Sequence, residues 1–388
     1  MNRFLILLSV SIMFFTAAIP AQKKQGQSMQ WKIAAELPVA KNQSKSLGFA
    51  GPVAGIYQNK MIVAGGANFP DAMPWLGGKK KYYDDVFVYV KIRSRIVLQK
   101  KQFKLPATVA YAASCSTSKG IVYAGGENEQ GISNKVFLLQ LAQNASTLVV
   151  QNLPDLPVAV TNASMTVHGN SIYIAGGEKA EGVSDMFFSL DMDHIAEGWK
   201  QLPLIPKPVS HAVLVFQKSK DHESIFLIGG RRKNTNGISN LYSSAFEFNL
   251  TKNQWAEKKS LPYTLSAGTG MATGTHSILL FGGDKGETFH KVEMLIAAIN
   301  AEKDELKKQQ LVQQKNKLQM SHPGFCKEVL CYNIITDEWT VVDSIPFDTP
   351  VTTVAFKWGN EVLIPSGEIK AGVRSPYILS AKLNSDIK

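Results

Sequence analysis

Short apolar runs that end in a glycine pair recur along this chain of 388 residues. Each run is four or five residues long and rich in β-branched and aromatic side chains, which favours a β-strand over a helix. A further run ends in Pro365-Ser366-Gly367, where serine stands in place of the first glycine. The glycine pairs are Gly65-Gly66, Gly125-Gly126, Gly176-Gly177, Gly229-Gly230 and Gly282-Gly283. The pattern predicts six copies of one β unit.

The spacing of these copies predicts the fold. Successive pairs lie 60, 51, 53 and 53 residues apart, and the last interval is 84. A period of ~50 residues built from strands and turns is typical of kelch β-propellers. Tryptophan recurs in phase, because Trp31, Trp255 and Trp339 each precede a Leu-Pro or Ile-Pro dipeptide by six residues. We predict an all-β, six-bladed kelch-type β-propeller that forms a single domain over residues 28–383.

The two ends of the chain are expected to share the last blade. Every other copy offers a further strand after the glycine pair, at Val86–Val90, Val136–Leu139, Met186–Leu190, Ser244–Phe248 and Val329–Tyr332, and then an outer strand. The last copy offers only Thr352–Phe356, Val362–Ile364 and Tyr377–Ala381. The run Met29–Ala35, near the N-terminus, is spare. Pairing it with the last copy closes the ring and removes an exposed sheet edge.

The segments after the glycine pairs should all open on one face of the ring, around its central channel. They are Ala67–Tyr83, Glu127–Asn134, Glu178–Ser184, Arg231–Asn240, Asp284–Lys327 and Glu368–Ser375. Function is expected on such loops above a rigid frame. The fifth contains a helical insertion in the fifth blade at about residues 287–320, with helix-forming composition and no proline or glycine. This insertion could wall the channel mouth, or be a solvent-exposed decoration or partner surface.

Residues 1–21 have the pattern of a signal peptide. Arg3 precedes the apolar run Phe4–Ala18, and small residues follow at a suitable cleavage position, Ala18 or Ala21. The run is too short to cross a bilayer, which needs ~20 residues. We therefore expect an exported, periplasmic protein with no membrane span after cleavage.

Cysteine content and charge change this picture little. Cys115 lies in a β-rich run and is expected in the core, whereas Cys326 and Cys331 could pair. The net charge is +11, with much of it in short lysine runs. Neither a basic helix nor the aromatic–basic pattern of nucleic-acid modules is present, so we expect no nucleic acid partner. A positive field would favour a small anionic ligand.

Candidate chemistry lies directly after the glycine pairs. The sequence contains no phosphate-binding glycine loop, nucleophile elbow or spaced histidine set, so no cofactor and no metal are expected. Glu127 and Arg231 occupy this position, where they could contact a ligand or cap nearby backbone amides. Glu368 also does, on a short loop that ends with Arg374. Such a pair can accept a proton and clamp a carboxylate, or it can be a plain loop salt bridge.

Three segments carry a resemblance to a known family. They are GEIKAGVR (residues 367–374), GFAGPVAGIYQNKMIVAGGANFPDAMPWLGGKKKYYDDV (residues 48–86) and SHPGFCKEVLCYN (residues 321–333). They resemble the N-acetylneuraminate epimerases, or sialic acid mutarotases, and more specifically the branch whose blades are cyclically permuted. The resemblance implies that Glu368 is the catalytic base and that Arg374 is its substrate-binding or catalytic partner. In the first-blade loop it points to Asn68 and Lys80 as substrate contacts.

The resemblance implies an isomerase that interconverts the α and β anomers of free N-acetylneuraminate by acid–base ring opening and closure. Its partner would be a small acidic sugar. Two alternatives remain at this level. One is a non-catalytic kelch module that binds protein or glycan, and the other is a mutarotase for another acidic sugar.

Overall fold

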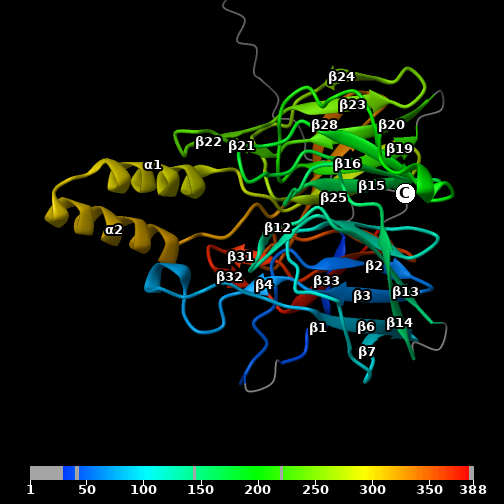
Figure 1. Ribbon diagram of the computed structural model, residues 1–388, viewed down its shortest axis with the longest axis horizontal. Helices are drawn as coiled ribbons and strands as arrows, with labels where there is room; N and C mark the ends of the chain where they lie inside the picture. The colour runs from blue at the N-terminus through cyan, green and yellow to red at the C-terminus, as the bar shows by residue number, and fades with distance from the viewer. Residues whose placement is uncertain (1–28, 40–42, 143–145, 219–221, 384–388) are drawn as a thin grey trace, which may run out of the picture.

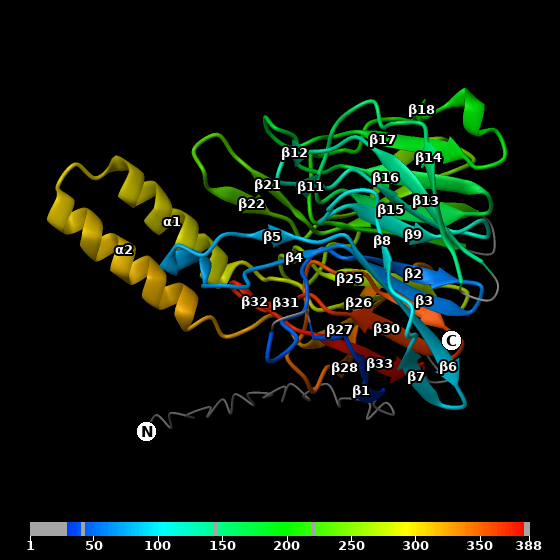
Figure 2. The same cartoon turned by 60° about the horizontal axis from the view of Figure 1, so that its bottom comes forward.

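The computed structural model describes residues 29–39, 43–142, 146–218 and 222–383. Its main strands form six antiparallel sheets of four or five strands, which surround a central axis (Figures 1 and 2). We call these sheets blades 1 to 6, in the chain order of the glycine pair, or Ser-Gly pair, that each contains. The predicted six-bladed, all-β fold is confirmed. The predicted signal peptide lies outside the described residues.

Each blade is built from strands that follow one another along the chain, except in blade 6. Blade 1 contains β2 (Val53–Tyr57), β3 (Lys60–Ala64), β6 (Asp85–Ile92), β7 (Arg95–Leu98) and β8 (Phe103–Lys104). Blade 2 contains β9 (Ala113–Ser116), β10 (Ile121–Ala124), β13 (Val136–Leu141) and β14 (Leu148–Leu153). Blade 3 contains β15 (Ser164–His168), β16 (Ser171–Ala175), β17 (Phe187–Asp191) and β18 (Lys200–Gln201), with the 3₁₀ turn η2 (Ile195–Glu197) before β18.

The second half of the chain repeats this order. Blade 4 contains β19 (Val213–Lys218), β20 (Glu223–Ile228), β23 (Ala245–Asn249) and β24 (Gln254–Lys258). Blade 5 contains β25 (Thr269–Thr273), β26 (Ser277–Phe281), β27 (Glu328–Asn333) and β28 (Glu338–Ser344). Blade 6 contains β29 (Phe356–Trp358), β30 (Glu361–Pro365), β33 (Tyr377–Lys382) and, from the start of the chain, β1 (Gln30–Glu36).

The shared blade predicted from the strand count is confirmed. β1 runs antiparallel to β33, with Gln30 opposite Lys382 and Glu36 opposite Tyr377. The backbone N–H of Leu37 also donates to the carbonyl of Pro376 at 2.8 Å. The N-terminal strand therefore supplies the outer edge of the last blade.

One predicted strand is wrong. The inner strand of blade 6 was expected at Thr352–Phe356, but β29 begins only at Phe356. In this register Val354 would lie opposite Pro365, and proline has no N–H to donate to a ladder. The side chain of Thr353 instead donates to the carbonyl of Pro365 at 2.6 Å. Proline at the end of β30 thus shortens its partner.

The core lies between the blades. Buried apolar side chains form six clusters, each shared by the facing sheets of two neighbouring blades. Removing one such side chain from water contributes roughly 1.5–3 kcal/mol. The in-phase tryptophans fasten the same interfaces, since the indole N–H of Trp255 donates to Pro203 O at 3.0 Å and that of Trp339 donates to Lys259 O at 2.8 Å.

The glycine pairs are needed because neighbouring blades approach closely there. Gly65 has φ +63°, and a Cβ at this position would lie 2.5 Å from the carbonyl oxygen of Val109 in blade 2. Serine replaces this glycine in blade 6, with φ +55°. Its hydroxyl accepts the N–H of Phe49 at 2.8 Å and donates to Ser375 O at 2.6 Å. Ser366 therefore ties blade 6 to blade 1.

A closed ring of backbone hydrogen bonds surrounds the channel. It is formed by Gly51, Tyr111, Asn162, His211, Ala267 and Thr352, which all have φ between 50° and 63°. Each N–H donates to the carbonyl of the residue before it in the ring, at 2.7–3.0 Å, and Gly51 closes the ring by donating to Thr352. The left-handed conformation costs free energy for residues other than glycine. The hydrogen bonds of the ring keep these residues in that conformation despite the cost. The ring lies at the base of the cavity that the loops surround.

Short hairpins rise from several of the loops after the glycine pairs. They are β4 (Ala67–Asn68) with β5 (Lys81–Tyr82), β11 (Glu127–Asn128) with β12 (Gly131–Ile132), β21 (Arg231–Lys233) with β22 (Ser239–Leu241), and β31 (Glu368–Lys370) with β32 (Val373–Arg374). The 3₁₀ turn η1 (Pro74–Leu76) lies between β4 and β5. These hairpins hold the loop side chains on defined backbone.

The helical insertion in blade 5 is a hairpin of two helices, α1 (Glu287–Ala301) and α2 (Glu305–Met320), rather than one continuous helix (Figure 2). Asp304 divides it, because its carboxylate accepts the N–H groups of Leu306 and Lys307 at 2.9 and 3.0 Å and so starts a new helix. The hairpin is anchored at one side by Glu293, which accepts from the backbone N–H and the hydroxyl of Ser239 at 2.9 and 2.7 Å.

Cys115, Cys326 and Cys331 are free thiols, so the possible Cys326–Cys331 disulfide is not formed in this structure. Cys331 lies within β27, and burial raises the pKa of its thiol. Across the described part of the chain, neither helix has the length and apolar content required to cross a bilayer.

Candidate functional site

A cavity of about 400 Å³ lies at the channel end where the post-glycine loops meet. Blades 1 to 4 contribute Lys80, Tyr111, Glu127, Asn162, Glu178, His211 and Arg231 to its lining. Blades 5 and 6 contribute Ala267, Asp284, Val351, Thr352, Glu368 and Ala371, and the helical hairpin with its exit contributes Thr288, Phe289, Val292, Gln319, His322 and Phe325. The hairpin is therefore a wall of the cavity, which was one of the two interpretations of the insertion.

Two backbone positions in each blade supply most of the polar lining. One is the left-handed residue of the channel ring, and the other is the residue directly after the glycine pair. The two positions are neighbours in every blade, because a bridge joins the residue directly before the ring residue to the residue after the glycine pair, for example Ala110 to Glu127 and Val351 to Glu368. Blade 1 carries only Gly51 and Ala67 there, so its side chains leave space that neighbouring blades can occupy.

Glu368 and Arg374, predicted as a pair, are brought together on the β31–β32 hairpin. They lie opposite each other in its register, and Glu368 Oε2 is 3.5 Å from Arg374 Nη2. The other carboxylate oxygen accepts the N–H of Gly372 at 2.9 Å, which fixes the carboxylate at the cavity wall. A carboxylate held in this way can accept a proton from a bound ligand.

Arg374 lies behind Glu368 and is not part of the lining. Its side chain is only 4% exposed, and its guanidinium lies over the ring of Phe69 at 4.7 Å. Nε and Nη1 are buried and have no hydrogen-bond partner among the residues that the structure describes. A buried cation with unused donors lowers the stability of the fold.

Lys80 and Glu127, both predicted as substrate contacts, meet on one wall of the cavity. Lys80 Nζ is 2.9 Å from Glu127 Oε1, and the same oxygen accepts the hydroxyl of Tyr82 at 2.8 Å. Burial acts to lower the pKa of Lys80, but Tyr111 and Glu127 outweigh it, so the pKa is raised. Lys80 therefore stays a cation facing the cavity.

Arg231, the predicted contact from blade 4, lies on the opposite side of the lining. Its guanidinium lies 4.5 Å from the ring of Phe289 on α1, and its Nη2 donates to Nε2 of His211 at 3.2 Å. Burial and the nearby Arg231 charge together hold the pKa of His211 well below its ordinary value. His211 is thus a neutral acceptor that orients Arg231.

Asn68 is the predicted contact that does not line the cavity. It is buried in the loop of blade 1, where its amide donates to Gly48 O at 2.9 Å and accepts the hydroxyl of Tyr83 at 2.9 Å. The structure gives Asn68 a role in bracing the loop that carries Lys80.

Several lining residues were not selected from the sequence, notably Tyr111, Asn162 and His322. A signal for the first two exists, because four of the six ring residues stand 14 positions before the first residue of their Gly-Gly or Ser-Gly pair. His322 had no such signal, since it follows the helical hairpin. Within the described residues, no cluster of three or more histidine, cysteine or acidic side chains is arranged to hold a metal ion.

These features define a class: a six-bladed β-propeller with a polar cavity at one channel mouth, closed on one side by a helical hairpin. The profile of the N-acetylneuraminate epimerase family matches residues 153–388, more than half of the chain. This chain belongs to the N-acetylneuraminate epimerase family. The three C-terminal strands of blade 6 and the Glu368–Arg374 pair lie within the matched region, whereas β1 lies outside it.

Individual relatives are distant. The chain is 24% identical over 230 residues to the N-acetylneuraminate epimerase of Haemophilus influenzae (strain PittEE), which covers 58% of both chains. It is 25% identical over 246 residues to that of Brucella melitensis biotype 1, covering 61% of both. The matches thus span about three fifths of the length of these curated relatives. The solved structure of YjhT superposes with a TM-score of 0.62 at 14% identity, covering 92% of this chain and 98% of that one, which supports the fold.

Proposed function

We propose that this protein is an isomerase that interconverts the α and β anomers of free N-acetylneuraminate. The observation that supports this most is the Glu368–Arg374 pair, a carboxylate at the cavity wall backed by a buried guanidinium with unused donors. Membership of the N-acetylneuraminate epimerase family supports the substrate class. The predicted signal peptide supports export, and we propose a periplasmic location.

The proposed reaction opens the sugar ring and closes it on the other face. Glu368 removes the proton of the anomeric hydroxyl, the bond between the anomeric carbon and the ring oxygen breaks, and the ring oxygen takes a proton. Rotation of the keto acid and the reverse steps give the other anomer. General acid–base catalysis of this kind contributes roughly 10²–10⁴-fold.

The cations around the cavity suit a substrate that carries a carboxylate. Lys80 and Arg231 line the cavity and can contact the carboxylate directly. Arg374 lies one layer behind Glu368 and outside the lining, and we propose that it positions the Glu368 carboxylate and that its charge favours an acidic sugar beside it. A bound keto acid would then stay in place while it rotates.

The test follows anomer exchange of N-acetylneuraminate by proton NMR, starting from a freshly dissolved single anomer. The wild-type protein should speed the approach to equilibrium, and Glu368→Gln should lose this by roughly 10²–10⁴-fold without loss of thermal stability. Glu129→Gln is the matched control, because Glu129 is exposed on the loop of blade 2 and only accepts a hydroxyl from Thr108 at 2.8 Å.

Two results would contradict the proposal. A wild-type protein that binds the sugar without speeding exchange would indicate a non-catalytic glycan-binding module. A Glu368→Gln variant with the full rate would remove Glu368 as the base.

A further inference from the structure

Tyr111 belongs to blade 2 but extends across blade 1 toward blade 6. It is a ring residue with φ +57°, two positions before the start of β9. A Cβ on Gly51 in blade 1 would lie 2.4 Å from the backbone nitrogen of Tyr111 and 2.5 Å from its Cδ1. The aromatic ring therefore occupies the space that a side chain of blade 1 would fill, and it lines the cavity there.

The phenol of Tyr111 lies among the charged groups of the site. It interacts with the guanidinium of Arg374 and with the carboxylate of Glu368, both from blade 6. The ammonium of Lys80 lies 4.9 Å from the centre of its ring. Among the residues that the structure describes, the Tyr111 hydroxyl has no hydrogen-bond acceptor, so its hydrogen is available to a ligand in the cavity. Burial raises the pKa of Tyr111, and the charges of Lys80 and Arg374 act against this rise by stabilising the negative charge that remains when the hydrogen leaves.

We propose that Tyr111 is the proton donor to the ring oxygen of the sugar, which completes the acid–base pair with Glu368. This inference rests on the proposed function. On ring opening, Glu368 takes the anomeric hydroxyl proton while the Tyr111 hydroxyl gives its proton to the ring oxygen as the carbon–oxygen bond breaks. The phenolate is held by Arg374 and Lys80. On closure, the new ring oxygen returns its proton to Tyr111, and Glu368 returns its proton to the carbonyl oxygen.

His322 is the rival donor in the lining. Its Nδ1 accepts the N–H of Gly324 at 3.0 Å, so Nε2 carries the hydrogen of the neutral ring. Burial lowers the pKa of His322, and Lys370 adds to this, against the opposing effect of Asp284 and Glu368. A neutral imidazole can donate a hydrogen bond, but it is a weaker acid than a phenol and therefore the poorer proton donor. The geometry thus assigns proton transfer to Tyr111.

The experiment compares Tyr111→Phe with wild type in the NMR exchange assay and in calorimetric binding of N-acetylneuraminate. We expect kcat to fall by roughly 10²–10³-fold, while the Kd changes by less than about threefold, because the phenyl ring still fills the space over Gly51. Tyr123→Phe, a buried change in β10 of the same blade, should keep the wild-type rate. His322→Asn tests the rival donor, because a loss of kcat as large as that of Tyr111→Phe would assign the proton transfer to His322 and overturn the role of Tyr111.

A second substitution keeps the proposal open to refutation where Tyr111→Phe folds poorly. Site-specific 3-fluorotyrosine at position 111 keeps the shape but makes the phenol more acidic, so kcat and its solvent isotope effect should both change. An unchanged kcat in both variants would overturn the role of Tyr111, as would a rise in Kd that accounts for the whole loss. An inactive wild type would overturn the proposed function and this role together, whereas an active wild type with active Tyr111→Phe overturns this role alone.

Discussion

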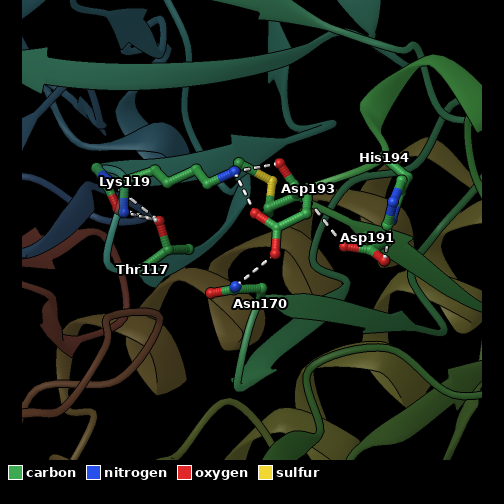
Figure 3. A network of polar contacts seen from close by, with 8 residues as sticks. Thr117, Lys119, Asn170, Asp191, Asp193 and His194 are labelled. Carbon is green, nitrogen blue, oxygen red and sulfur yellow. Dashed lines mark hydrogen bonds and ion pairs between the residues drawn. The ribbon is translucent and has the colours of Figure 1, made fainter.

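Two polar clusters at opposite ends of the blades use similar side chains in different ways. The first joins blades 2 and 3 away from the cavity (Figure 3). Lys119 there contacts Asp193 at 2.7 Å, Asp193 accepts from Asn170 at 2.6 Å, and His194 contacts Asp191 at 2.9 Å. These side chains are solvent-exposed, and each has a partner. The hydrogen bond from Lys119 lowers the pKa of Asp193, and Asp191 raises the pKa of His194.

The second cluster is the one around the cavity. Arg374 is buried there, with two N–H groups that have no partner in the described structure, and His211 is kept neutral by burial. An exposed cluster of charged pairs adds little to stability, and a buried cluster with unused donors lowers it. The fold around the cavity cluster therefore holds it in place at some loss of stability, whereas the exposed cluster only links two blades.

The largest effect should come from removing the buried cation. Arg374→Met should reduce anomer exchange by roughly 100-fold or more, while the free energy of unfolding changes by less than about 1 kcal/mol, because the Glu368 carboxylate left behind faces the cavity and keeps the N–H of Gly372. The reason is that methionine fills the site beside Phe69 without unsatisfied donors. Lys119→Met, the matched change in the exposed cluster, should alter neither quantity measurably. NMR exchange and urea unfolding measure both. A strongly destabilised Arg374→Met would show that the guanidinium supports the fold.

The next largest effect concerns the ring that supports the cavity. Gly51→Ala should lower the free energy of unfolding by about 3 kcal/mol, because the new Cβ meets Tyr111 at 2.4 Å and φ is +63°. Gly169→Ala is the control with a similar φ of +56° but no heavy atom within 4 Å of the new Cβ, and it should lose only about 1 kcal/mol. Equal losses in urea unfolding would mean that the Tyr111 contact yields easily.

The smallest effect is a difference in pH dependence between two histidines. The pKa of His211 is lowered in the folded protein. Below about pH 6.5 the unfolded chain therefore binds a proton at His211 that the folded protein does not bind, so the free energy of unfolding decreases as the pH falls. The pKa of His194 is raised, so its contribution is full below about pH 6.5 and is lost as pH rises through the folded value.

Replacing each histidine with asparagine tests these two opposite pH dependences of stability. His211→Asn should lose less stability than wild type between pH 7 and pH 5, and asparagine suits the left-handed backbone, as Asn162 shows. His194→Asn should differ from wild type slightly and in the opposite sense. Denaturation in urea at several pH values measures both. The same pH profile for wild type and His211→Asn would mean that His211 takes up a proton in the folded protein.

Much of the fold was predictable because its signals are local. A glycine pair, or the Ser-Gly pair of blade 6, marks each close approach of two blades, as at Gly65, and a tryptophan in phase marks three of the outer strands, as at Trp255. The division of the helical insertion also has a local signal, because Asp304 is an N-cap residue. The helix-forming composition on both sides of Asp304 made this signal hard to recognise in the sequence. The late start of β29 was not predictable in the same way, because it depends on which residue lies opposite Pro365.

The candidate site shows the same contrast between features with a local signal and features that depend on distant residues. Glu368 and Arg374 are six residues apart on one hairpin, so a motif of eight residues was enough to bring them together. Tyr111 is more than 250 residues from Glu368 in the chain, and nothing near it in the sequence indicates that its ring lies over Gly51. The burial of Arg374, the bracing role of Asn68 and the placement of His322 likewise follow from packing between blades.

The amino-acid sequence by itself determined the repeat, the closure of the ring by its two ends, and the carboxylate–guanidinium pair, because each depends on residues close together or on a period that recurs. Only the tertiary structure decided which side chains share the cavity and which of their donors remain unused. Those properties depend on distances between blades, and such distances are set by the packing of the whole ring.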